Sequence, residues 1–183
     1  MGYLRSGNNV ALGAMGIGDG KVLHSNMAEG DMVSLGGESH TELGWTIYLN
    51  EDGEAGSGSV IYSGDEISIK GMGNGLWMHD NSEDGGGASL GSYHPEHGWI
   101  ITLCDGGDGR ISLGDDCMLT RMSDGKCMHS NSAEGSGFSI GGSSHTELGW
   151  SMLDCGNPEV EYGTYLVDGC NVHVAPLGLG DGR

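Results

Sequence analysis

The segment KCMHSNSAEGSGFSIGGSSHTELGW at residues 126–150 occurs earlier in the chain, with some substitutions, as KVLHSNMAEGDMVSLGGESHTELGW at residues 21–45. A third version, LWMHDNSEDGGGASLGSYHPEHGW, lies between them at residues 76–99. A fixed internal period is the signature of a repeat architecture, so this recurrence decides how the rest of the sequence is interpreted. The chain consists of three related units.

A second shared phrase precedes each of these segments. It reads YLRSGNNVALGAMG from Tyr3, VIYSGDEISIKGMG from Val60 and RISLGDDCMLTRMS from Arg110. Each repeat is therefore about fifty residues long, and the three span approximately 1–52, 57–105 and 107–155. The phrase returns as YLVDGCNVHVAPLG from Tyr165, which predicts a partial repeat over 160–179. We expect residues 1–183 to form one domain.

Apolar and polar residues alternate within each repeat, as at Trp45, Ile47 and Leu49. A period of two is typical of β-strands, and the Gly, Asn, Asp and Ser clusters between the alternating stretches supply turns. In the first repeat the pattern predicts strands near 10–14, 21–25, 31–36 and 44–49. No amphipathic helical period is present.

Three four-stranded repeats make twelve strands in a pseudo-threefold arrangement. The all-β architecture that closes such an array without free edges is the β-trefoil, a six-stranded barrel capped by three hairpins. Three propeller blades would be too few to surround an axis, so we predict the β-trefoil. Equivalent inward-facing residues should then pack in common core layers, namely Trp45, Trp99, Trp150, Leu35, Leu90 and Ile140.

The charge balance excludes two classes of partner. The chain has 7 Lys and Arg against 26 Asp and Glu, a formal charge of −19. Such a chain repels phosphate backbones and anionic lipid headgroups, so we expect neither nucleic acid nor a membrane as partner. No run approaches the ~20 apolar residues of a membrane helix.

The five cysteines, at positions 104, 117, 127, 155 and 170, are odd in number and lack the C-x-x-C spacing. This pattern favours neither a zinc knuckle nor a complete disulfide framework. The pattern still permits one or two local disulfides.

The segment SGDEISIKGMGNGLWMHDN, followed by GASLGSY and GWIITL, resembles the MIR-type β-trefoil repeat, with its G-D-x-(V/I)-x-L, T-G-x-x-L-H-S-H and closing W-x-(V/I) motifs. The resemblance covers nearly the whole chain. It fails at Asn26, Asn81 and Asn131, where the family has a second histidine. MIR-type domains occur in endoplasmic-reticulum mannosyltransferases, their chaperone-associated relatives and large intracellular calcium channels. There they bind or position partners without being catalytic, so the resemblance implies a binding or scaffolding role.

Polar residues that recur at equivalent positions are the candidate binding residues. One group follows the second strand of each repeat, and the other lies in the loop before each tryptophan. The first group is His24, Asn26, His79, Asn81, His129 and Asn131. The second group is His40, Glu42, His94, Glu96, His145 and Glu147. We expect the strand histidines to be buried hydrogen-bonding groups and the loop residues to be exposed.

These residue types suit two kinds of chemistry, metal binding and nucleophilic catalysis. Histidine and carboxylate suit Zn²⁺, but two ligands within three residues do not complete a four-ligand site, so metal binding stays open and no cofactor is expected. Successive strand residues point to opposite faces, so His24 cannot activate the adjacent Ser25. We therefore expect a non-catalytic protein.

Two functions remain. The first is a self-assembling structural or scaffold protein, such as an extracellular matrix or silica-associated filament protein, which the repetition of whole surface loops and the partial repeat favour. The alternative is a lectin-like carbohydrate-binding module with three equivalent sites. The expected partners are further copies of the chain, a mineral or a glycan, and the expected location is extracellular, with a cytoplasmic location as the alternative.

Overall fold

The computed structural model describes residues 2–16, 21–25, 33–36, 43–80, 88–130, 138–142 and 145–155. Within these ranges the chain is all-β, apart from short 3-10 helices in its loops. The strands in chain order are β1 (Asn8–Ala14), β2 (Val22–His24), β3 (Ser34–Gly36), β4 (Trp45–Leu49), β5 (Glu66–Gly71), β6 (Trp77–His79), β7 (Ser89–Gly91), β8 (Trp99–Leu103), β9 (Asp116–Arg121), β10 (Cys127–His129), β11 (Ser139–Gly141) and β12 (Trp150–Asp154). The 3-10 helices are η2 (Asn50–Ala55), η3 (Pro95–His97) and η4 (Thr146–Leu148).

The four strands predicted for the first repeat overlap β1, β2, β3 and β4. The 3-10 helices were not expected. Two of them have only three residues each, which is too short for a helical period to show in the sequence.

Six strands form a closed antiparallel barrel in the order β1, β4, β5, β8, β9 and β12, with β12 returning to β1. The closing pair runs from Val10 opposite Asp154 to Ala14 opposite Trp150. Closure leaves these strands without free edges. The N-terminal strand therefore holds the closing position, and the predicted partial repeat at 160–179 lies outside the described residues.

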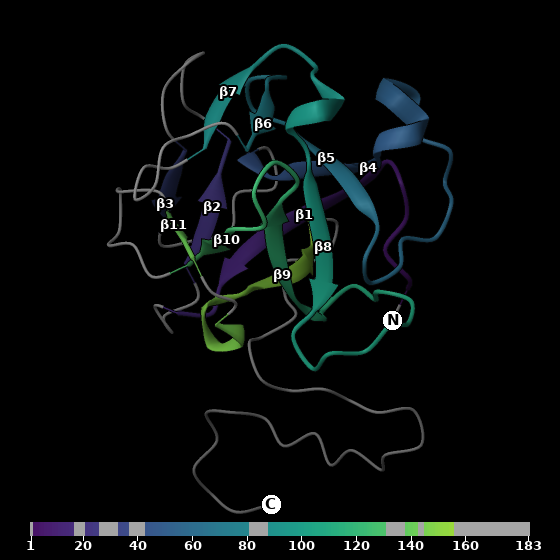
Figure 1. The fold of residues 1–183 in the computed structure, drawn as a ribbon. Coiled ribbons are helices and arrows are strands. Elements are labelled where there is room, and N and C mark those ends of the chain that lie inside the picture. The colour runs from purple at the N-terminus through teal and green to yellow at the C-terminus, as the bar shows by residue number, and fades with distance from the viewer. Residues whose placement is uncertain are drawn as a thin grey trace, which may run out of the picture.

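Three hairpins extend from the barrel. β2–β3 pairs with β1, β6–β7 with β5, and β10–β11 with β9. The central pairs of the hairpins are equivalent, with Leu23 opposite Leu35, Met78 opposite Leu90 and Met128 opposite Ile140. Figure 1 shows the hairpins on one side of the barrel, away from the N-terminus.

The core contains the residues predicted for it. The side chains of Trp45, Trp99 and Trp150 are completely buried, and Leu35, Leu90 and Ile140 pack in the same cluster. Each indole N–H donates a hydrogen bond to a strand carbonyl, at 2.7 Å to Leu23, 2.9 Å to Met78 and 3.0 Å to Met128. A buried indole needs such an acceptor, so each tryptophan fixes its hairpin to the barrel.

A ring of backbone hydrogen bonds joins the segments that precede β1, β5 and β9. The N–H of Leu4 donates to Ile111 at 2.7 Å, Ile111 to Ile61 at 3.0 Å, and Ile61 to Leu4 at 2.9 Å. The three side chains are fully buried. The shared phrase near the start of each repeat therefore links all three repeats to one another.

Candidate functional site

The strand histidines His24, His79 and His129 end β2, β6 and β10 and are buried, as expected. Each imidazole lies against a glycine of the neighbouring strand, namely Gly36, Gly91 or Gly141. A Cβ atom at any of these glycines would press on the ring, most mildly at Gly91, where the nearest ring carbon is 3.0 Å away. The G that follows S-L or S-I in each repeat is therefore required by close packing.

His79 is held in its neutral form by its surroundings. Its Nε2 atom lies 2.6 Å from the carbonyl oxygen of Ser92. Desolvation lowers the pKa of His79, and the neighbouring imidazoles of His94 and His97 lower it further. A neutral imidazole is a hydrogen-bonding group or a ligand rather than a fixed cation.

The loop residues of the second and third repeats form matching exposed pairs. Nδ1 of His94 lies 3.0 Å from the Glu96 carboxylate, and Nδ1 of His145 lies 3.4 Å from the Glu147 carboxylate. Both histidine side chains are 51 % exposed. In each case a 3-10 helix begins directly after the histidine and turns the glutamate back toward it.

Each exposed ring also meets the strand histidine of its own repeat. The ring centres of His94 and His79 are 5.5 Å apart, and those of His145 and His129 are also 5.5 Å apart. The structure thus brings three of the predicted residues together in the second repeat and three in the third. Of the remaining predicted residues, His24 is buried at the end of β2. The others, His40, Glu42, Asn26, Asn81 and Asn131, lie outside the described residues.

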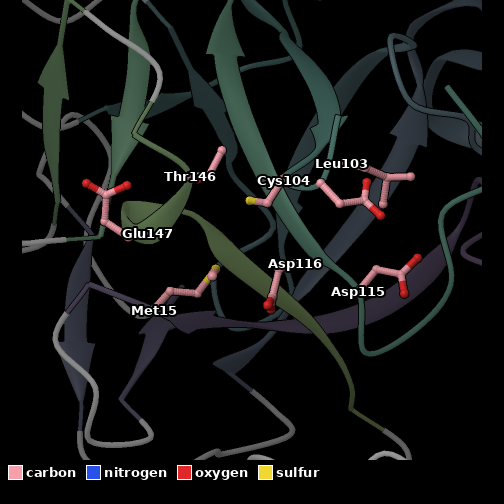
Figure 2. Close-up of a pocket in the computed structure, with 8 residues that line it drawn as sticks. Met15, Leu103, Cys104, Asp115, Asp116, Thr146 and Glu147 are labelled. Carbon is pink, nitrogen blue, oxygen red and sulfur yellow. The ribbon is translucent and has the colours of Figure 1, made fainter. Parts of the chain in front are cut away.

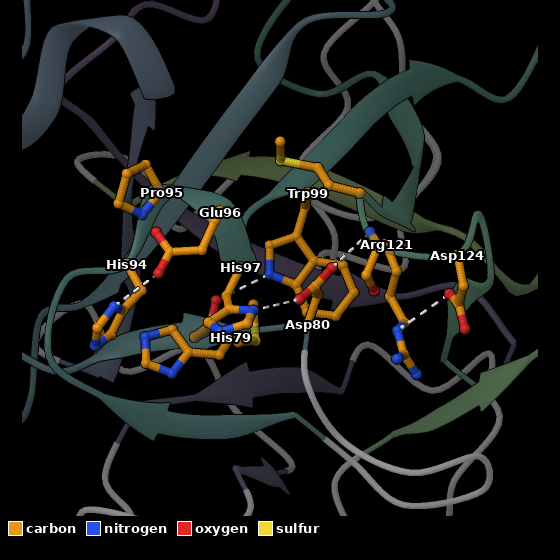
Figure 3. A network of polar contacts seen from close by, with 12 residues as sticks. His79, Asp80, His94, Pro95, Glu96, His97, Trp99, Arg121 and Asp124 are labelled. Carbon is orange, nitrogen blue, oxygen red and sulfur yellow. Dashed lines mark hydrogen bonds and ion pairs between the residues drawn. The ribbon is translucent and has the colours of Figure 1, made fainter.

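The second repeat differs from the other two at a pair of positions that the sequence analysis did not single out. His97 stands where the other repeats have Leu43 and Leu148. Asp80 stands where they have Ser25 and Ser130. The Asp80 side chain is completely buried, and its Oδ1 atom lies 3.3 Å from Nδ1 of His97, as Figure 3 shows. Both differences are visible when the repeats are aligned.

Asp80 also makes a contact between repeats that serine makes elsewhere. Its Oδ2 accepts a hydrogen bond from the Ser123 N–H at 3.0 Å. The hydroxyls of Ser25 and Ser130 accept equivalent bonds from the N–H groups of Gly73, at 2.9 Å, and Gly16, at 2.8 Å. A serine therefore suffices for this contact, and the additional oxygen of Asp80 serves His97.

An aromatic cluster is centred on Trp77 and Tyr93 of the second repeat, with Tyr48 of the first repeat beside it. The Trp77 ring centre is 4.6 Å from that of Tyr93 and 5.3 Å from that of Tyr48, and the Lys70 ammonium lies 5.1 Å from the Trp77 ring centre. Tyr48 and Tyr93 remain half-buried. The residues equivalent to Trp77 are Val22 and Cys127, and those equivalent to Tyr93 are Ser39 and Ser144. The Trp77–Tyr93 contact is therefore particular to the second repeat. Tyr93 directly precedes His94 in the sequence.

A pocket of about 480 Å³ lies beside the loop that precedes Trp150 in the third repeat (Figure 2). It is lined by Met15, Leu103, Cys104, Asp105, Asp115, Asp116, Thr146 and Glu147. Its carboxylates have structural partners, since Asp116 accepts a bond from the Ser151 hydroxyl at 2.5 Å and Asp105 from the Gly107 N–H at 2.9 Å. Burial, with these carboxylates nearby, raises the pKa of the Cys104 thiol to about 11. The thiol is therefore protonated and weakly nucleophilic at neutral pH.

Cys104, Cys117, Cys127 and Cys155 are free thiols. In the described part of the chain, no group of three or more His, Cys, Asp or Glu side chains is placed to hold a metal ion. The same residues include no helix long and apolar enough to span a membrane.

The fold is shared with solved structures. The designed threefold-symmetric protein ThreeFoil matches with a TM-score of 0.55 at 17 % identity, covering 80 % of this chain and 98 % of that one. The SDF2-like protein of Arabidopsis thaliana matches with a TM-score of 0.57 at 15 % identity, covering 81 % and 94 %. No family model matches the chain, and no curated protein matches it in sequence.

A third match is the Saccharomyces cerevisiae protein O-mannosyltransferase Pmt1–Pmt2 complex bound to the sugar donor, with a TM-score of 0.64 at 13 % identity. The match covers 83 % of this chain but 25 % of that one. The neighbours are β-trefoil proteins, and the plant and yeast proteins have MIR domains. The chain has a trefoil-like, MIR-like fold, in agreement with the resemblance of its sequence.

Proposed function

We propose that the protein is a non-catalytic, lectin-like scaffold that binds carbohydrate through the loops in front of its core tryptophans, one in each of three β-trefoil repeats. The observation that carries the proposal is the recurrence of one exposed constellation. His94 with Glu96, and His145 with Glu147, have the same contacts and the same exposure of the histidine. Core packing does not require an exposed pair to be repeated.

The chemistry of these pairs suits sugar hydroxyls. A carboxylate accepts hydrogen bonds and a neutral imidazole both donates and accepts them, so each pair can bond adjacent hydroxyl groups of a pyranose. The second repeat adds Tyr93, which lies on Trp77 and could pack against the apolar face of a sugar ring. Several weak sites on a rigid barrel would gain affinity on a multivalent glycan. The MIR-like fold also supports a carbohydrate- or protein-binding scaffold.

Several observations support a role without catalysis. The hydroxyls of Ser25 and Ser130 accept bonds from backbone N–H groups of neighbouring turns. Cys104 and Cys155 have pKa values raised to about 11, chiefly by burial, so they are poor nucleophiles at neutral pH. We place this function outside the cell, where multivalent glycans are accessible.

A glycan array tests the proposal. The parent protein should bind at least one glycan class, and replacing His94 and Glu96 with Ala should reduce binding more than replacing His145 and Glu147, because only the second loop has the neighbouring aromatic cluster. Both variants must unfold at the parent's temperature, which shows that lost binding is not lost folding. An array without hits for the folded parent would rule out the carbohydrate ligand.

Self-assembly is the second candidate. The S-H-T-E-L-G-W loop is identical in the first and third repeats, and His145 and Glu147 of the third are exposed. Such loops would give the molecule equivalent contact points for further copies or for a mineral such as silica. Electron microscopy of the full chain, and of a chain ending at residue 162, would test it. The full chain should form filaments or lattices and the truncated chain only monomers. Monodisperse monomers of the full chain, with and without silicic acid, would exclude this function.

A further inference from the structure

Burial of the Asp80 carboxylate beside His97 has an unfavourable desolvation free energy, which the other two repeats avoid because they have serine at this position. The Asp80 side chain is completely buried, and removing a carboxylate from water is unfavourable unless partners compensate. Serine makes the equivalent contact between repeats, so that contact does not explain the carboxylate. Its distinctive effect is to hold Nδ1 of His97 at 3.3 Å.

A carboxylate that accepts a hydrogen bond from one imidazole nitrogen fixes the tautomer of the ring and the direction of the other nitrogen. This arrangement is the usual outer shell of histidines that ligate metals. His97 has it through Asp80, and His94 has it through Glu96, at 3.0 Å. In both histidines Nε2 is the nitrogen that remains for a ligand, because Nδ1 contacts a carboxylate and no described residue is bonded to Nε2.

The two rings are close enough to share one ion. Their ring centres are 5.9 Å apart, with planes inclined by 60°, and Figure 3 draws both side chains. With metal–nitrogen bonds of about 2.0–2.1 Å, two imidazoles on one tetrahedral ion have centres roughly 5–5.5 Å apart. The observed separation is close to this range, and His94, with half of its side chain exposed, has room to turn its Nε2 toward that of His97.

From this geometry we propose that the second repeat contains a binding site for a borderline divalent metal ion, Zn²⁺ or Cu²⁺, with His94 and His97 as ligands through Nε2 and water completing the coordination. Imidazole nitrogen suits these ions. Glu96 and Asp80 are positioning residues that also bring negative charge near the cation. Two protein ligands agree with the finding that no described group of three or more is placed for a metal. This site shares His94 and Glu96 with the proposed glycan site, but zinc binding does not require that the loops bind glycans.

The third repeat is a natural control. It has the same exposed pair, His145 with Glu147, but Leu148 stands at the position of His97 and Ser130 at that of Asp80. The substitutions His97→Leu and Asp80→Ser therefore introduce residues that this fold already accepts at equivalent positions. Their effect on folding should be small.

Calorimetric titration of the full chain with ZnCl₂ at pH 7.5 tests the site. His97→Leu should remove one equivalent of bound zinc, whereas His145→Ala should retain it. Asp80→Ser should weaken this equivalent by about 10- to 100-fold, and Asp80→Asn, which keeps an oxygen acceptor for Nδ1, should weaken it less. The combined variant Ser130→Asp with Leu148→His should add an equivalent.

Imidazole nitrogen resonances identify the ligands directly. Zinc should shift the Nε2 signals of His94 and His97 and leave those of His145 unshifted. Unfolding curves of all variants establish that they are folded. The proposal is overturned if the parent binds no zinc, if His97→Leu retains every equivalent, or if the shifted signals belong to other histidines.

Discussion

The imidazole of His129 lies directly on Gly141, at the point where the third hairpin leaves the barrel. An added Cβ at Gly141 would come within 2.6 Å of the ring nitrogen Nδ1 and closer still to Cε1. The same contact joins His24 to Gly36, and a looser one joins His79 to Gly91. Each of the three hairpins therefore requires a glycine at this position, because an imidazole packs where a Cβ atom would lie.

Gly141→Ala should therefore destabilise the protein by about 1–3 kcal/mol, as overpacked sites do. Gly91→Ala should cost less, because the ring is 3.0 Å away there. Urea unfolding measures both. In a protein that already carries His129→Ala, Gly141→Ala should lower the free energy of unfolding much less, because the imidazole that the new methyl group would contact is absent. An unchanged cost in that background would contradict the packing explanation.

Trp99→Ala should lower the free energy of unfolding by about 3–5 kcal/mol. The side chain is fully buried and its N–H bond to Met78 at 2.9 Å is lost with it. Glu96→Ala, three residues earlier and exposed, is the matched control and should change stability by less than about 0.5 kcal/mol. Denaturant titrations of the two variants compare them, and similar costs would mean that Trp99 is not a core residue.

His79 should make stability depend on pH. Its pKa is lowered in the folded protein, chiefly by desolvation, so below the ordinary value of about 6.5 the unfolded chain binds a proton more readily than the folded one. Its contribution is therefore complete above about pH 6.5 and is lost as pH falls toward the lowered pKa.

The comparison is with His79→Gln, which can still donate to the Ser92 carbonyl but does not titrate. The free energy of unfolding of the parent, relative to this variant, should decrease between about pH 7 and pH 5. Chemical denaturation at several pH values measures it. A pH-independent difference would show that burial does not affect the pKa of His79.

Cys104 should react slowly with iodoacetamide at pH 8, because its pKa is raised to about 11 and the thiolate reacts. The rate should rise roughly tenfold per pH unit until the thiol is ionised. Mass spectrometry of the labelled peptide reports it. The unfolded chain in guanidinium is the control, and equal rates at Cys104 in the native and unfolded protein at pH 8 would contradict the raised pKa.

The repeats, the strands of the first repeat and the core tryptophans could be predicted because each has a local signature in the sequence. Trp45, Trp99 and Trp150 open alternating stretches, and such stretches bury one face wherever they pair. The one-turn helices η3 and η4 have no such signature.

The candidate site was predicted in part. His94 and Glu96 could be predicted because they recur at equivalent positions in the other repeats. Their 3.0 Å contact could not, because it depends on the turn of η3 that brings the carboxylate back to the imidazole. His97 and Asp80 were missed because the repeat was read for what its copies share. Their importance lies in how the second copy differs from the other two, and an alignment of the three copies shows these differences.

The sequence by itself determined that the chain has three related β units and which residues they bury, because alternation and turn residues act over a few positions. Only the tertiary structure decided that β1 closes on β12, that His129 needs Gly141, and that Asp80 meets His97 across seventeen residues. These relationships depend on distances between segments that are remote along the chain. Such distances follow from the closed barrel as a whole, not from any local pattern.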